Sequence, residues 1–171
     1  MLCFAYGSNM STQRLAARIP ARFITTAMLP AYRLAFHQRG GDSSGKCDIV
    51  PASSQSAVYG VVWEVAPHHK PTLDGYEGLG VAYDETWLTV TDLASEGQFE
   101  VQAYLGKITS ADMRPYTWYK HHVLTGAREH GLPAAYVRAL ESIAAHHDPD
   151  TERHARETAL HGFNELLVRG A

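Results

Sequence analysis

The segment FAYGSNM at residues 4–10 brings together residue types that can bind an anion or a polarised carbonyl. Its apolar run stops at Gly7, Ser8 and Asn9, and a helix-like segment begins at Ser11, which predicts a strand, a tight loop and a helix start. Gly7 can adopt backbone angles closed to other residues, so successive N–H groups can face a ligand while Ser8 or Asn9 adds a polar side chain. An ordinary turn in which Asn9 or Ser11 caps the helix is the alternative interpretation.

Glu77 is the carboxylate best placed for proton transfer, because a short predicted helix ends there between two glycines. Tyr76 precedes it, and Tyr83 follows shortly after. A carboxylate held beside apolar rings is desolvated, which raises its proton affinity and makes it a better base near neutral pH. A solvated glutamate at a helix end is the alternative. Three neighbouring carboxylates could be confused with it: Asp74, Asp84 and Glu85.

The ten histidines include three adjacent pairs, and none has the spacing of a metal site. Adjacent histidines in a helix point about 100° apart, so they are poor co-ligands, and the HxxxH and HExxH spacings do not occur. We therefore expect polar surface residues. The pairs are His68–His69, His121–His122 and His146–His147, with His154 and His161 on the last predicted helix.

Other reactive or bulky side chains have a structural interpretation beside a functional one. Ser8 does not lie in a Gly-x-Ser-x-Gly context, which favours a loop residue over a nucleophile. Cationic side chains around the loop at residues 39–46 either meet a substrate carboxylate or are solvated; they are Arg33, Arg39 and Lys46. Tryptophans are expected in the core, with Trp118 at a pocket edge as the alternative; they are Trp63, Trp87 and Trp118.

The elements that must position these residues come in two groups, strands first and helices last. Apolar, β-branched and alternating patterns predict strands at 23–38 with a break at Pro30, 47–51, 57–65, 83–92 and 99–105. A short helix is expected at 68–76, and longer ones at 116–130, 133–145 and 151–168. This order predicts the α+β class, with a closed or strongly curved mixed sheet and helices packed outside.

Composition predicts a conventional globular protein of one domain over residues 1–171. Hydrophobic residues make up 45% and charged residues 19%, which excludes disorder. The formal net charge of −3 gives no reason to expect nucleic acid or an anionic membrane as a partner. No apolar run is long enough for a membrane span and no signal peptide is recognised, so we expect a cytoplasmic protein. Cys3 and Cys47 are expected to be small buried hydrophobes.

Five segments in order resemble the γ-glutamylcyclotransferase family over about residues 2–143. They are FAYGSN at 4–9, VVWEV at 61–65, LDGYEG at 73–78, YK at 119–120 and GAREHGLP at 126–133. The resemblance implies a small β-barrel with flanking helices, a substrate loop from Tyr6 to Asn9 and a catalytic glutamate at Glu77. It also implies an aromatic lining from Tyr83, Tyr104 and Tyr119. Tyr83 aligns with the family pattern only when a one-residue gap is introduced.

The implied reaction converts a γ-glutamyl amino acid or amine into 5-oxoproline when the substrate's own α-amine attacks its γ-carbonyl. No enzyme nucleophile, metal or cofactor is required, and the partner is a small molecule. Alternatives are a binding or regulatory domain without chemistry, a γ-glutamylamine or glutathione-directed cyclotransferase, and a deprotecting cyclotransferase of aminoglycoside biosynthesis. Gly75 and Tyr76 depart from the polar pair that the family would place before Glu77. The sequence also predicts a helical C-terminal extension at 144–171, of which residues 148–171 have no counterpart in the family. The sequence leaves open whether the protein forms a homodimer.

Overall fold

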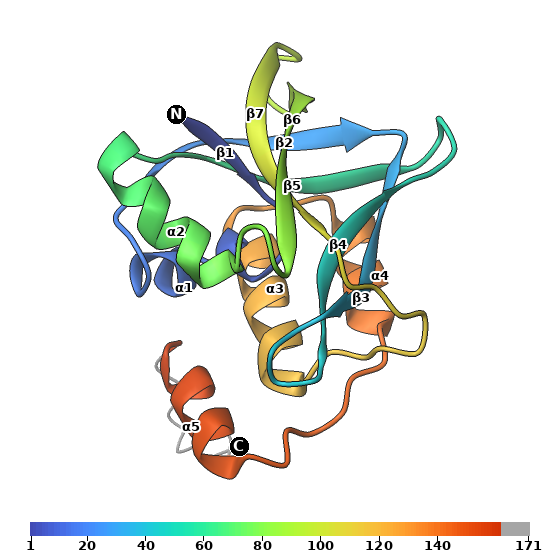
Figure 1. The fold of residues 1–171 in the computed structure, drawn as a ribbon. Coiled ribbons are helices and arrows are strands. Elements are labelled where there is room, and N and C mark those ends of the chain that lie inside the picture. Colours follow the sequence, from blue (N-terminus) through green and yellow to red (C-terminus); the bar gives the residue numbers. More distant parts are fainter. Residues whose placement is uncertain (162–171) are drawn as a thin grey trace, which may run out of the picture.

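Five strands close into a barrel in the computed structural model, which describes residues 1–161 (Figure 1). Around the barrel the order is β1 (Leu2–Ala5), β5 (Ala57–Glu64), β2 (Arg22–Pro30), β6 (Tyr83–Asp92) and β7 (Gln98–Gly106). Strand β1 runs antiparallel to β5 and parallel to β7, so the sheet is mixed. The predicted class and the closed mixed sheet are confirmed.

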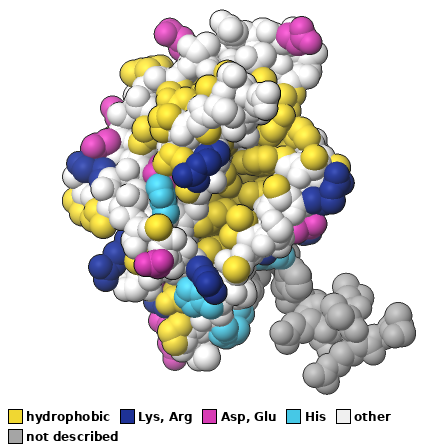
Figure 2. All heavy atoms as spheres, turned by 90° about the vertical axis from the view of Figure 1, so that its right-hand side faces the viewer, with side chains coloured by type: hydrophobic (Ala, Val, Ile, Leu, Met, Phe, Trp, Pro, Cys, Tyr) yellow, Lys and Arg dark blue, Asp and Glu magenta, His cyan; other side chains and the backbone are white. Residues whose placement is uncertain are grey.

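A second sheet of two strands, β3 (Tyr32–Arg39) and β4 (Gly45–Pro51), extends from the barrel. The predicted break at Pro30 is confirmed, because β2 ends there and Ala31 adopts a positive φ of 61° before β3 begins. The hairpin lies on the opposite side of the molecule from α2 (Figure 1). On that face hydrophobic side chains gather in a central hollow, with Lys and Arg side chains near its margin (Figure 2).

The helices cover the barrel on the outside. The short elements are η1 (Ser8–Met10), α1 (Thr12–Ala16), η2 (Pro67–His69) and α2 (Lys70–Glu77). The longer ones are α3 (Thr117–Glu129), α4 (Ala134–Ser142) and α5 (Thr151–Ala159). Helix α5 lies below the rest, joined by an extended segment (Figure 1). The helix predicted over 151–168 therefore ends at Ala159, and residues 162–168 lie outside the described residues.

The core fills the barrel and the space between it and α3. Val61 and Val62, which are adjacent on β5 and point to opposite faces, are both fully buried. Both cysteines are buried free thiols. Trp63 and Trp118 are core residues as expected, but the prediction for Trp87 is wrong: it is 60% exposed, because strand alternation places it on the outer face of β6. Among residues 1–161 no helix is long and apolar enough to cross a membrane.

Candidate functional site

A cavity of about 60 Å³ lies where β1 ends, between the loop at residues 7–9 and the end of α2. The proposed base and every residue of the expected substrate loop and aromatic lining contribute to its lining. These residues are Tyr6, Gly7, Ser8, Asn9, Glu77, Tyr83, Tyr104 and Tyr119. The barrel thus brings together side chains that are far apart in the sequence.

The loop is fixed by its own backbone and by the barrel wall. The Met10 N–H donates to the Gly7 carbonyl at 3.0 Å, and the Trp63 indole N–H donates to the Asn9 carbonyl at 3.0 Å. Gly7 has a φ of −121° and a ψ of −141°, so no positive φ is present at this position. Space is the reason for glycine, since a Cβ would lie 3.0 Å from the Cys47 Cβ and 3.2 Å from the Tyr119 hydroxyl.

Three consecutive backbone N–H groups lie in this loop. Among the described residues none accepts a hydrogen bond from the N–H of Gly7, Ser8 or Asn9. The helix that follows is capped by the Ser11 side chain, one of the two alternatives considered for the turn, so Asn9 is left for other contacts. The Ser8 hydroxyl likewise bonds to none of residues 1–161, so nothing there activates it as a nucleophile.

Glu77 is the last residue of α2, which ends because Gly78 adopts the left-handed conformation with φ 66°. Its Oε1 accepts from Asn9 Nδ2 at 2.8 Å and from Arg18 Nη1 at 2.7 Å. Its Oε2 bonds to no other described residue. The expected surroundings of apolar rings were incomplete, because a guanidinium also contacts the carboxylate. Sequence reasoning missed Arg18, whose one signal was its position a helical turn after Arg14.

The four site tyrosines are held by hydrogen bonds to the protein. The Tyr83 hydroxyl donates to the Cys47 carbonyl at 2.9 Å, and the Tyr119 hydroxyl accepts from the Cys47 N–H at 3.1 Å. Tyr6 donates to the Tyr104 carbonyl. Burial raises the pKa of Tyr6, Tyr83 and Tyr119 well above the usual value, and raises that of Tyr104 as well. These rings therefore remain neutral and shape the cavity.

The neighbouring carboxylates are engaged elsewhere, which separates them from Glu77. Asp74 accepts from the Tyr104 hydroxyl at 2.6 Å and pairs with Lys70. Lys70 also pairs with Glu85 at 2.8 Å, and Asp84 pairs with Lys107 at 2.9 Å. None of the three lines the cavity.

A second cavity of about 260 Å³ adjoins the first and is lined by basic side chains. Ser8, Glu77, Tyr83 and Tyr119 line both cavities. The cations of the outer cavity are Arg14, Arg18, Arg39 and Lys46. Lys46 pairs with Asp42 at 2.6 Å, and Arg14 pairs with Glu157. Of the three cations that the sequence nominated, Arg39 and Lys46 reach this cavity, and Arg33 lines neither.

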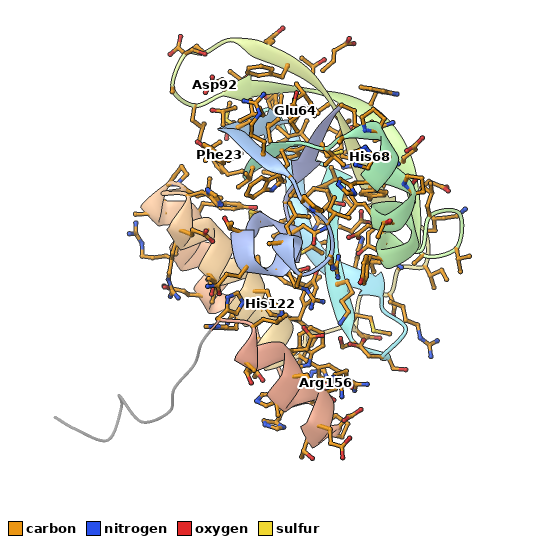
Figure 3. The ribbon with its side chains drawn as sticks, turned by 90° about the vertical axis from the view of Figure 1, so that its left-hand side faces the viewer. Phe23, Glu64, His68, Asp92, His122 and Arg156 are labelled. Carbon is orange, nitrogen blue, oxygen red and sulfur yellow. The ribbon has the colours of Figure 1, made fainter. Side chains whose placement is uncertain are left out.

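His122 corrects the expectation that the paired histidines lie at the surface. It is fully buried where α3 meets α5 (Figure 3). One ring nitrogen contacts His161 and the other lies 3.0 Å from Glu157 Oε2. Glu157 of α5 and His161, two residues after that helix ends, satisfy both nitrogens, so the imidazole can be buried.

Comparisons with known proteins agree on one family. The model of the AIG2-like family matches residues 57–140. A γ-glutamylcyclotransferase of Bos taurus is 33% identical over 83% of this chain and 78% of the relative, and that of Homo sapiens is 32% identical over the same shares. A solved structure described as a γ-glutamyl cyclotransferase superposes with a TM-score of 0.79 at 28% identity, covering 85% of this chain and 88% of that chain.

Proposed function

This chain belongs to the γ-glutamylcyclotransferase family, and on that premise we propose that it converts a γ-glutamyl amino acid or amine into 5-oxoproline and the free amine. Glu77 is the general acid and base of this proposal. The observation that carries it is the contact between Asn9 and Glu77, 2.8 Å apart and 68 residues apart in the chain. It joins the loop of backbone N–H groups to a carboxylate with one unengaged oxygen.

In the proposed reaction the substrate supplies its own nucleophile. Glu77 takes a proton from the α-ammonium group, and the amine nitrogen then forms a bond to the γ-carbonyl carbon. Bond formation leaves a positively charged ring nitrogen, whose extra proton passes to solvent. The tetrahedral intermediate then collapses as the γ-amide C–N bond breaks, and Glu77 returns its proton to the departing nitrogen. Proton transfer of this kind is worth about 10²–10⁴ in rate.

The loop at Gly7, Ser8 and Asn9 is the proposed binding site for the oxygen that becomes negatively charged. Amide groups held in place before the reaction stabilise such an oxyanion without reorganisation, and one donor is worth about 10²–10³ in rate. The neutral tyrosines form walls that hold the folded substrate, so that its amine and carbonyl meet.

The test is a panel of γ-glutamyl amino acids, γ-glutamyl amines and glutathione incubated with the purified protein, with 5-oxoproline measured by mass spectrometry. A matched control is the same γ-glutamyl compound with an acetylated α-amine, which cannot close the ring. We expect 5-oxoproline from at least one free-amine compound and no turnover of its acetylated form. Release of glutamate in place of 5-oxoproline would show a hydrolase, and binding without turnover would show a domain that does no chemistry.

A further inference from the structure

Arg18 follows α1 in the chain and contacts the proposed base, Glu77, at 2.7 Å. We propose that Arg18 is a positioning residue: its guanidinium fixes the orientation of the Glu77 carboxylate and places a positive charge against Oε1, leaving Oε2 for proton transfer. This inference rests on the proposed function, because it concerns the same reaction.

The geometry is a closed triangle of three hydrogen bonds. Arg18 Nη1 donates to Glu77 Oε1 at 2.7 Å and to Asn9 Oδ1 at 3.0 Å, and Asn9 Nδ2 donates to Glu77 Oε1 at 2.8 Å. Two bonds converge on the same carboxylate oxygen, so the plane of the carboxylate is restrained. The Asn9 amide is also fixed, with its oxygen toward the cation and its nitrogen toward the anion.

Burial makes this pair stronger than an ion pair on the surface. The side chains of Arg18 and Glu77 are 13% and 16% exposed. The Arg18 Cζ lies 5.2 Å from the centroid of the Tyr76 ring, which is itself exposed. Because solvent screens this site weakly, removal of one partner would leave a poorly compensated charge on the other.

The guanidinium is the cation best placed to act on Glu77. Three other cations line the outer cavity with Glu77, but Arg14 pairs with Glu157, Lys46 pairs with Asp42, and Arg39 forms no ion pair with Glu77. The other titratable groups that face Glu77 come from four elements and a strand end, and burial raises the pKa of each, that of Cys47 to about 12. They are Tyr6, Cys47, Tyr83, Tyr104 and Tyr119. All of these are neutral at physiological pH, so Arg18 is the charged group that contacts Glu77 among the described residues.

The test compares Arg18→Gln, which removes the charge, with Arg18→Lys, which keeps it. Arg138→Met is the matched control, since Arg138 is exposed on α4. For Arg18→Gln we expect the acid limb of the kcat profile to move up by about 1–3 pH units, the range over which a neighbouring cation acts on a carboxyl group. The variant should lose turnover at neutral pH and regain it at higher pH, with KM little changed. Arg18→Lys should keep the wild-type acid limb.

A role confined to holding the segment after α1 against α2 would give a different result. Turnover would then fall by the same factor at every pH, with the acid limb unmoved, and that result would overturn the proposal. Arg18→Met carries the same expectation as Arg18→Gln. If neither Arg18→Gln nor Arg18→Met folds, Arg18 is required for folding, and that result would also overturn the proposal.

A second readout needs no substrate. In protein labelled with ¹³C at the glutamate carboxyl, the resonance absent from Glu77→Gln belongs to Glu77, and it should titrate at higher pH in Arg18→Gln than in the wild type. A chain that forms no 5-oxoproline but shows this displacement would refute the proposed function alone. An active chain without the displacement would refute the positioning role alone.

Discussion

Gly126 lies where α3 crosses the substrate-loop segment, and Gly126→Ala tests whether this contact sets the loop. A Cβ at residue 126 would lie 2.6 Å from the Met10 Cβ and closer still to the backbone nitrogen of Ser11. Ordinary contacts begin at 3.4 Å, so the methyl group requires a backbone movement of about 1 Å.

The expected loss of stability follows from two opposing effects. Overpacking against backbone costs about 3 kcal/mol, at the upper end of its range, while alanine gains about 1 kcal/mol of helix propensity over glycine. The net loss is about 2 kcal/mol, or about 4–8 °C in melting temperature for a chain of this size. A movement of about 1 Å at the loop should also lower kcat/KM about 10²-fold.

The assay combines thermal melting with 5-oxoproline formation. Gly75→Ala is the control for stability, because Gly75 lies within α2 and a Cβ there meets nothing within 4 Å. We expect this control to melt at or above the wild-type temperature. A Gly126→Ala protein with wild-type stability and activity would refute the account of the loop's position.

Three further predictions follow from the same contacts. Burial lowers the pKa of His122 to about 4, so the unfolded chain binds more protons between pH 4 and the usual 6.5; stability should fall by about 3 kcal/mol as pH falls through that window. Urea unfolding of His122→Gln should therefore show a smaller loss of unfolding free energy between pH 6.5 and pH 4 than the wild type shows. The same pH dependence in both proteins would contradict this prediction. Gly7→Val should abolish most of the turnover because a side chain at residue 7 would contact Cys47, whereas Ser8→Ala should lower kcat far less. Circular dichroism will check that both variants fold. Loss of activity in Ser8→Ala with activity retained in Gly7→Val would favour a serine nucleophile. Dialysis against a chelator should leave turnover unchanged, since the substrate amine is the nucleophile, and zinc-restored activity would contradict this.

Local patterns in the sequence predicted the site because strands and glycine-bounded turns are encoded over a few residues. The strand before the substrate loop, the loop itself and the helix ending at Glu77 were all predicted in this way, and family resemblance identified the lining tyrosines. The meeting of Asn9 and Glu77 follows from barrel closure, which pairs β1 with both β5 and β7.

The parts that the sequence did not predict depend on contacts between distant segments. Arg18 reaches a residue 59 positions away, and His122 is buried by a helix 35 positions further along. Arginine and histidine are usually found at the solvated surface, so the residue type alone favours exposure for Arg18 and His122. Only the contact with a distant segment reverses that preference. Trp87 shows the opposite case, because its bulk favours the core and strand alternation places it outside.

Replacement of Glu77 by glutamine tests the central claim most directly. Glu77→Gln keeps the shape of the side chain and removes its capacity to shuttle a proton, and Glu100→Gln, at an exposed position on β7, is the matched control. With a γ-glutamyl compound that the wild type converts to 5-oxoproline, kcat of Glu77→Gln should fall by at least about 10²–10⁴ while substrate still binds and the fold is retained. Glu100→Gln should match the wild type. Near-wild-type turnover by a folded Glu77→Gln protein would contradict the assignment of Glu77 as the base.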